Sequence, residues 1–238
     1  MSNHVALTPE DHQDIRLKTN RSADLGDAVM SCVTFPSEFR SLQNHYPILF
    51  QLTAERDTFR PIALLGFEAG ENLFLRGNKW DARYVPLAID IQPFLIGLSQ
   101  DPEGDHKIHI DMDSPRLTKG DGIRLFDQFG KPTDYLDDMA EKLGNLHDGH
   151  QRTADYIAAL QKYDLLEPFV LEVELNDGSK NRLVGFHTIN EENLYSLDAA
   201  ALGELNAQRF LLPTYMAVAS LSNLVNLIDR RNAKLDDV

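Results

Sequence analysis

The sequence contains little cysteine: Cys32 is the only one among 238 residues. A single cysteine excludes an intramolecular disulfide bond and a zinc site built from cysteine ligands. Cys32 lies in the apolar stretch 29–35. This position predicts a buried, unreactive thiol rather than a nucleophile.

Long apolar runs are also missing, since the longest fall short of the roughly 20 residues that a membrane-spanning helix needs. The first residues, MSNHVALTPEDHQDIRLK, lack the positively charged start and apolar core that are typical of a secretory signal peptide. We therefore expect a protein of the cytoplasm with no membrane span.

Basic residues are in deficit, with 23 Lys and Arg against 37 Asp and Glu and a net charge of −14. A chain with this charge is repelled by phosphate backbones unless it carries a local basic stripe, and the sequence has none. This balance argues against nucleic acid as a partner. The hydrophobic content of 42% is that of an ordinary globular protein.

Two pairs of apolar runs predict antiparallel β-hairpins, at about 46–67 and 169–187. The second pair alternates apolar and polar residues on both sides of Asn176-Asp177-Gly178, a typical hairpin turn. The middle segment, 133–166, has helical periodicity that we expect Gly144 and Gly149 to interrupt. Further helices should begin at Asn190, Asp198 and Pro213. The pattern predicts an α+β fold in one domain, 1–238, and the one candidate for a domain boundary lies near 150–168.

The segment Gly70–Pro86 carries the most unusual set of side chains. It contains the only tryptophan of the chain, flanked by charged residues, and Gly66, Gly70 and Gly77 give the backbone freedom. Aromatic faces cover apolar ligand surface and arginine binds carboxylates through two hydrogen bonds, so this segment is a candidate site for a peptide or a sugar. The alternative is that the tryptophan closes the open end of the hairpin while the charged residues pair locally. The candidate binding residues are Glu71, Asn72, Trp80, Asp81, Arg83 and Tyr84.

A second hypothesis concerns metal binding by His109, Asp111 and His187. Two histidines and one carboxylate form the iron site of non-haem oxygenases, and residues i and i+2 of a strand share one face. The arginine that usually follows the distal histidine in such enzymes is missing here, and His109-x-Asp111 also fits an ordinary acidic edge strand. His147 and His150 form a third, weaker group, for which we favour a solvated turn.

No other reactive motif is present. The sequence has no Gly-x-Gly-x-x-Gly, no phosphate-binding loop of the Walker type and no Gly-x-Ser-x-Gly. No cofactor is therefore expected, and the residues favour a binding protein over an enzyme without deciding between them.

Several strings of the sequence resemble the bacterial SapC family. They are HYPI at 45–48 followed by Phe50, PIALLG at 61–66, GEN at 70–72, WDARYVP at 80–86, DMDSP at 111–115, LFD at 125–127 and the segment 184–191. The resemblance covers nearly the whole chain. It implies an association with bacterial surface-layer (S-layer) proteins, and it brings no catalytic residues with it. On this basis we expect an accessory protein that binds a protein or peptide partner through Gly70–Pro86. A structural surface-layer component and an iron oxygenase are the alternatives.

Overall fold

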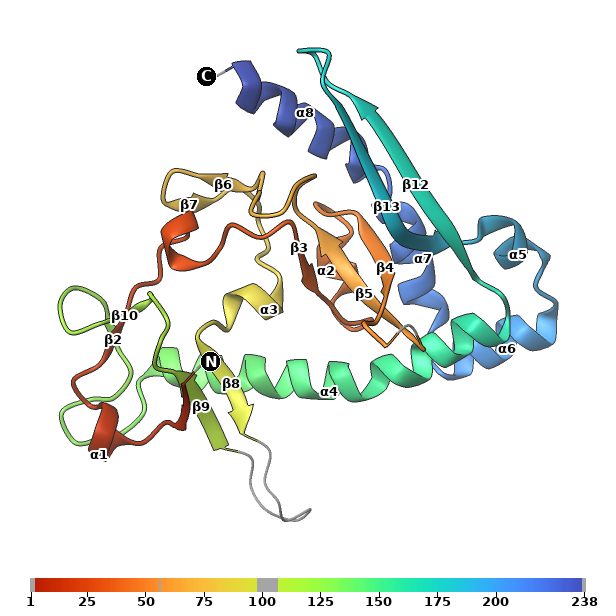
Figure 1. Cartoon of the computed structure of the whole chain (residues 1–238). Helices are drawn as coiled ribbons and strands as arrows, with labels where there is room; N and C mark the ends of the chain where they lie inside the picture. The colour runs from red at the N-terminus through yellow and green to blue at the C-terminus, as the bar shows by residue number, and fades with distance from the viewer. Residues whose placement is uncertain (1–2, 56, 98–106, 237–238) are drawn as a thin grey trace. The chain divides into compact units, whose positions relative to one another are not determined.

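The computed structural model describes residues 3–55, 57–97 and 107–236 (Figure 1). It combines antiparallel sheets with one long helix and a series of C-terminal helices, so the predicted α+β class is confirmed. The chain forms two compact units. We call unit 1 the residues Met1–Asp27, Leu75–Trp80 and Leu87–Asp148, and unit 2 the residues Ala28–Phe74, Asp81–Pro86 and Gly149–Val238.

The described residues of unit 1 form three small antiparallel sheets. The first has the order β1-β9-β8, the second β10-β2-β11, and the third is the hairpin β6-β7. The strands are β1 (His4–Ala6), β2 (Arg16–Leu17), β6 (Leu75–Arg76), β7 (Lys79–Trp80), β8 (Phe94–Gly97), β9 (Lys107–Asp111), β10 (Leu117–Thr118) and β11 (Ile123–Arg124). The helical pieces are α1 (Pro9–His12), the 3-10 helix η1 (Ala23–Leu25), α3 (Leu87–Asp90) and the first half of α4 (Asp134–Lys162).

The core of unit 1 joins sheet residues to the apolar face of α4. Phe94 and Ile110, which are paired in the β8–β9 ladder, are both buried. They belong to one cluster with Leu136, Met139 and Leu143 of α4, which recur at helical spacing. The core that this periodicity predicted is therefore present.

Unit 2 is built on a five-stranded antiparallel sheet with the order β12-β13-β4-β5-β3. The strands are β3 (Ser31–Val33), β4 (Ile48–Leu52), β5 (Phe59–Leu64), β12 (Leu166–Glu174) and β13 (Lys180–Ile189). Both predicted hairpins are confirmed, because β4 pairs with β5 and β12 pairs with β13. The pairing of β13 with β4 joins the two hairpins into one sheet.

Helices complete unit 2. They are α2 (Phe39–Leu42), the second half of α4, α5 (Glu191–Ser196), α6 (Ala199–Ala207), α7 (Leu211–Ser220) and α8 (Asn223–Asp236). Tyr156 of α4 lies at the centre of the core, with its ring edge-on to Phe39 and Phe210 and tilted against Phe50. The predicted N-caps are found: the side chain of Asn190 accepts from the backbone N–H of Asn193 at 2.9 Å, and Asp198 caps α6 in the same way.

The helix α4 corrects one prediction. It runs unbroken for 29 residues, through both Gly144 and Gly149 (Figure 1). Gly149 is buried where the helix meets Phe35 and Ser37, and a Cβ atom there would lie only 3.0 Å from the Cβ of Phe35. The glycine therefore permits a close approach and does not end the helix.

One segment of the described residues, Leu211–Leu235, is long and apolar enough by composition to cross a membrane, with 33% of its apolar window buried. In the structure it consists of α7 and α8, joined by a turn at Leu221-Ser222. Its buried residues, including Ala217 and Leu227, belong to the apolar core.

Candidate functional site

Glu71 is a buried carboxylate that shapes the loop after β5. One oxygen, Oε2, accepts a hydrogen bond from the backbone N–H of Phe67 at 3.0 Å, and the other accepts from the guanidinium of Arg231 on α8. Only 6% of the Glu71 side chain is exposed. The turn also needs Gly66, because a Cβ atom there would lie 2.7 Å from the carbonyl oxygen of Glu71. Glu71 is thus engaged within the protein.

Asn72 is buried beside it and holds the same turn. Its Oδ1 accepts from the backbone N–H of Phe74 at 2.9 Å. A polar side chain that bonds the backbone two residues further on is a common way of fixing a turn. Glu71 and Asn72 are therefore better placed to hold the loop than to meet a ligand.

Asp81 forms the second contact between this segment and α8. Its carboxylate accepts from Arg230 at 2.7 Å, and its backbone carbonyl accepts from the same guanidinium at 3.0 Å. The guanidinium also lies over the ring of Phe74, 4.5 Å from the centroid. A single arginine thus contacts Phe74 and Asp81, the residues of unit 2 that come directly before and after the β6–β7 hairpin.

Tyr84 anchors the segment at its other end. Its hydroxyl donates to the buried carboxylate of Glu38 at 3.0 Å, and Thr34 donates to the other oxygen of Glu38 at 2.6 Å. The backbone carbonyl of Tyr84 accepts from the hydroxyl of the buried Tyr46. Within the WDARYVP string, Asp81 and Tyr84 therefore act as supports for the backbone.

Arg83 differs from its neighbours because it is exposed. Within the part of the chain that the structure describes, it forms no hydrogen bond and no ion pair. Its positive charge is felt at His45, whose pKa lies below the ordinary value, first because of burial and then because of the charges of Arg230 and Arg83. Arg83 is therefore a solvent-facing cation on a backbone held from both sides.

Trp80 belongs to unit 1, where it ends the short hairpin β6–β7 opposite Leu75. Its side chain is half-buried. The structure therefore places it in a different unit from the other five candidate residues.

The structure gives no support to the hypothesis of an iron site at His109, Asp111 and His187. His109 and Asp111 lie on β9 in unit 1, whereas His187 lies on β13 in unit 2 with its ring edge-on to Phe59, 4.7 Å between centroids. Among residues 3–55, 57–97 and 107–236, no three His, Cys, Asp or Glu side chains form a group that could hold a metal ion. β9 and β13 also belong to different sheets.

The pair His147 and His150 lies within α4 and not in a turn. His150 packs its ring edge-on against Phe35, 6.2 Å between centroids. The absence of a metal-binding group among the described residues covers these two histidines as well.

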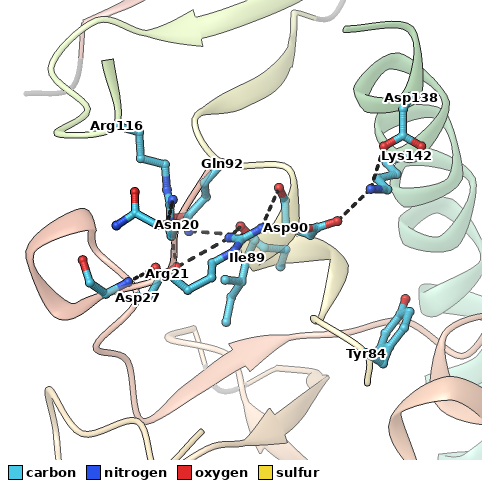
Figure 2. A network of polar contacts seen from close by, with 12 residues as sticks. Asn20, Arg21, Asp27, Tyr84, Ile89, Asp90, Gln92, Arg116, Asp138 and Lys142 are labelled. Carbon is cyan, nitrogen blue, oxygen red and sulfur yellow. Dashed lines mark hydrogen bonds and ion pairs between the residues drawn. The ribbon is translucent and has the colours of Figure 1, made fainter. Parts of the chain in front are cut away.

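A second polar cluster, in unit 1, carries no signal in the sequence (Figure 2). Arg116 and Asp27 are fully buried and paired, and Arg21 lies 3.6 Å from the same carboxylate oxygen. Arg21 also pairs with Asp90, which lies 2.8 Å from the ammonium group of Lys142. The cluster alternates positive and negative charges, and this balance is typical of a structural network.

The chain belongs to the SapC family: the family's model matches residues 7–227, which include parts of both units. The resemblance noted in the sequence is therefore confirmed. No curated protein and no solved structure was found to match. The association with surface layers that the resemblance implies stays a prediction.

Proposed function

We propose that this SapC-family protein is a binding protein that contacts a protein or peptide partner through the segment Gly70–Pro86, with Arg83 as the main contact. The support is the division of roles along the segment. Asp81 and Tyr84 are held by Arg230 and Glu38, so the backbone of Arg83 is fixed while its guanidinium remains exposed. A segment whose backbone is already fixed loses less conformational entropy on binding than a mobile one.

The chemistry of Arg83 suggests a carboxylate on the partner. Guanidinium groups bind carboxylates through two parallel, charge-assisted hydrogen bonds, and arginine is enriched among residues that dominate binding energies. Such a hydrogen bond contributes about 1.5–3 kcal/mol, which corresponds to an affinity change of roughly 10- to 150-fold. We therefore expect an acidic side chain or a C-terminal carboxylate opposite Arg83.

Affinity capture from a bacterial extract tests this proposal. Immobilised wild-type protein and the Arg83→Ala variant are compared by quantitative mass spectrometry of the retained proteins. Arg40→Ala is the matched control, because Arg40 is also exposed in unit 2 and forms no ion pair among the described residues. A partner retained by the wild type and the control and lost with Arg83→Ala supports the proposal. Equal retention by all three proteins contradicts it.

The only tryptophan provides a second readout. Trp80 is half-buried and lies three residues before Arg83 in the chain. Addition of a captured partner should shift its emission in the wild type and in Arg40→Ala. An emission unchanged at saturating partner argues that the partner binds elsewhere.

A further inference from the structure

One histidine of unit 2 has a buried ring nitrogen without a hydrogen-bond partner. The Nδ1 atom of His187 on β13 is enclosed by protein, and within the part of the chain that the structure describes no donor or acceptor reaches it. The ring lies edge-on to Phe59 of β5, with 4.7 Å between the centroids. One polar end of the imidazole therefore lies in a site that offers no acceptor for an N–H group.

Protonation of His187 adds a second polar group to be satisfied. An imidazolium carries an N–H group on both ring nitrogens, so Nδ1 becomes a donor without an acceptor and the partly buried ring becomes charged. Both changes cost free energy in a site that is shielded from water. In agreement with this, burial is the cause of the lowered pKa of His187. The site favours the neutral imidazole.

The neighbouring elements supply no counter-charge to His187. β4 consists of uncharged residues, and α7, which packs against β13, contains no Asp, Glu, Lys or Arg and one titratable side chain, the exposed Tyr215. The charged groups on the other strands around His187 are Arg60 of β5, Glu167 of β12 and, at the far end of the hairpin β12–β13, Glu172, Glu174, Lys180 and Arg182. None of these groups contributes to the pKa shift of His187.

His187 also lies in the shortest ladder of its sheet. Among the described residues, β13 pairs with β4 through two residue pairs, Phe186 with Gln51 and His187 with Phe50. The ladders β4–β5 and β12–β13 are longer, so each of these two hairpins is held by its own strand pairing. The hairpin β12–β13 can therefore separate from β4 at this junction and keep its own ladder.

We propose that His187 is an acid-sensitive latch, whose protonation opens the junction between the hairpin β12–β13 and β4 while the other ladders of the sheet stay paired. In the closed junction the imidazole is neutral. In the open junction the ring turns into water, where both of its N–H groups are hydrated. The open form binds the proton at a higher pH than the closed form does, so its population rises as the pH falls below about 6.5. One proton raises that population by at most about tenfold for each pH unit.

Hydrogen exchange of the full chain, followed by mass spectrometry at pH 7.5 and pH 5.5, tests the latch. After correction for the intrinsic exchange rates, the amides of β13 should open about three- to tenfold more often at the lower pH. The ladder β3–β5 of the same sheet and the ladder β8–β9 of unit 1 are internal references. Their protection should change less than that of β13.

Two variants assign the response to one side chain. His187→Gln removes the titrating group and keeps a polar, uncharged side chain, so the extra opening of β13 at pH 5.5 should disappear. His150→Gln is the matched control, because His150 is also a histidine of unit 2 with its ring edge-on to a phenylalanine, but it is exposed and lies on α4. This control should respond to pH as the wild type does.

An NMR titration of the ring protons gives the pKa of His187 in the wild type and keeps the proposal testable if His187→Gln does not fold. Three results would overturn the latch. One is a pKa of His187 at or above about 6.5. Another is an equal loss of protection in β13 and in the two reference ladders, which would indicate unfolding of the whole protein. The third is the same response to pH in His187→Gln and in the wild type.

Discussion

The buried pair Asp27–Arg116 allows the most direct test of the forces that stabilise unit 1. The Asp27 side chain is 0% exposed and the Arg116 side chain 2% exposed. Arg116 also donates to the carbonyl of Asn20 at 3.0 Å, and Asp27 accepts from the backbone N–H of Ser22 at 2.8 Å. Removal of one partner from such a pair costs about 3–5 kcal/mol, because the other charge remains buried without compensation.

The surroundings decide where each variant lies within that range. In Arg116→Met, Arg21 remains 3.6 Å from the Asp27 carboxylate, so we expect a loss of about 3 kcal/mol. In Asp27→Asn the carboxamide still accepts from Ser22, but the buried Arg116 has no counter-charge. We therefore expect the upper end, about 5 kcal/mol. For a chain of this size, 3 kcal/mol corresponds to a melting temperature lower by about 6–12 °C.

The double variant separates the pair energy from simple loss of packing. Asp27→Asn combined with Arg116→Met leaves no uncompensated charge of this pair, so its loss should be smaller than the sum of the two single losses by at least about 2 kcal/mol. Urea unfolding followed by circular dichroism gives the free energies. Arg182→Met is the control, since its ion pair with Glu172 is exposed and should contribute at most about 1 kcal/mol. Additive losses, or single losses no larger than that of the control, would refute the reasoning.

Three further predictions concern a glycine pair, the thiol and a histidine. Gly144→Ala should raise the free energy of unfolding by about 0.5–1 kcal/mol. Gly149→Ala should leave the free energy of unfolding unchanged or lower it, because the new Cβ would lie 3.0 Å from the Cβ of Phe35. Urea unfolding compares the two variants. Burial raises the pKa of the Cys32 thiol, and the negative charge of Glu38 adds a smaller increase. The thiol of the native protein should therefore react with Ellman's reagent far more slowly at pH 8 than the thiol of the protein in urea does. Equal rates would contradict this prediction. Burial lowers the pKa of His187, so the unfolded chain binds a proton at this histidine at a higher pH than the folded protein does. The free energy of unfolding should therefore fall as the pH drops through about 6.5 and below. In His187→Gln this decline between pH 7.5 and 5 should be smaller, and an identical decline would exclude His187 as its cause.

Local chemistry accounts for the parts of the fold that were predictable. The hairpin at β12–β13 follows from alternation and from a turn in which Gly178 has a φ of +80° and Asp177 accepts from the backbone N–H of Ser179. The caps at Asn190 and Asp198 are equally local, since each bond reaches only three residues along the chain. Such signals need no knowledge of distant residues.

The glycines of α4 show why local signals can mislead. Glycine lowers helix propensity by about 1 kcal/mol relative to alanine, and two glycines therefore predict an interruption. Packing outweighs this cost, since Leu143 and Tyr156, one on either side of the glycine pair, are buried in the cores of their respective units. Sequence alone cannot supply that information, because it depends on which residues meet in space.

The sequence allowed the segment that carries the candidate site to be predicted, but not the contacts that its side chains make. Unusual composition identified the residues between Gly70 and Pro86, but the partners of Glu71 and Asp81 lie 160 and 149 positions further along the chain. From the sequence, Arg230 and Arg231 could be explained as cations favoured near a helix C-terminus. Pairings over such distances leave no local pattern, and the same applies to Asp27 and Arg116.

The distribution of charge along α7 and α8 bears on the proposed contact at Arg83. Phe210–Ile228 carries no charge, and the next residues include Arg230, Arg231 and Lys234. Two of these cations hold Asp81 and Glu71, and Lys234 lies 3.7 Å from the Glu71 carboxylate. The cations of α8 are thus directed at the segment that carries Arg83, so the exposed guanidinium of Arg83 stands on a backbone that α8 helps to position.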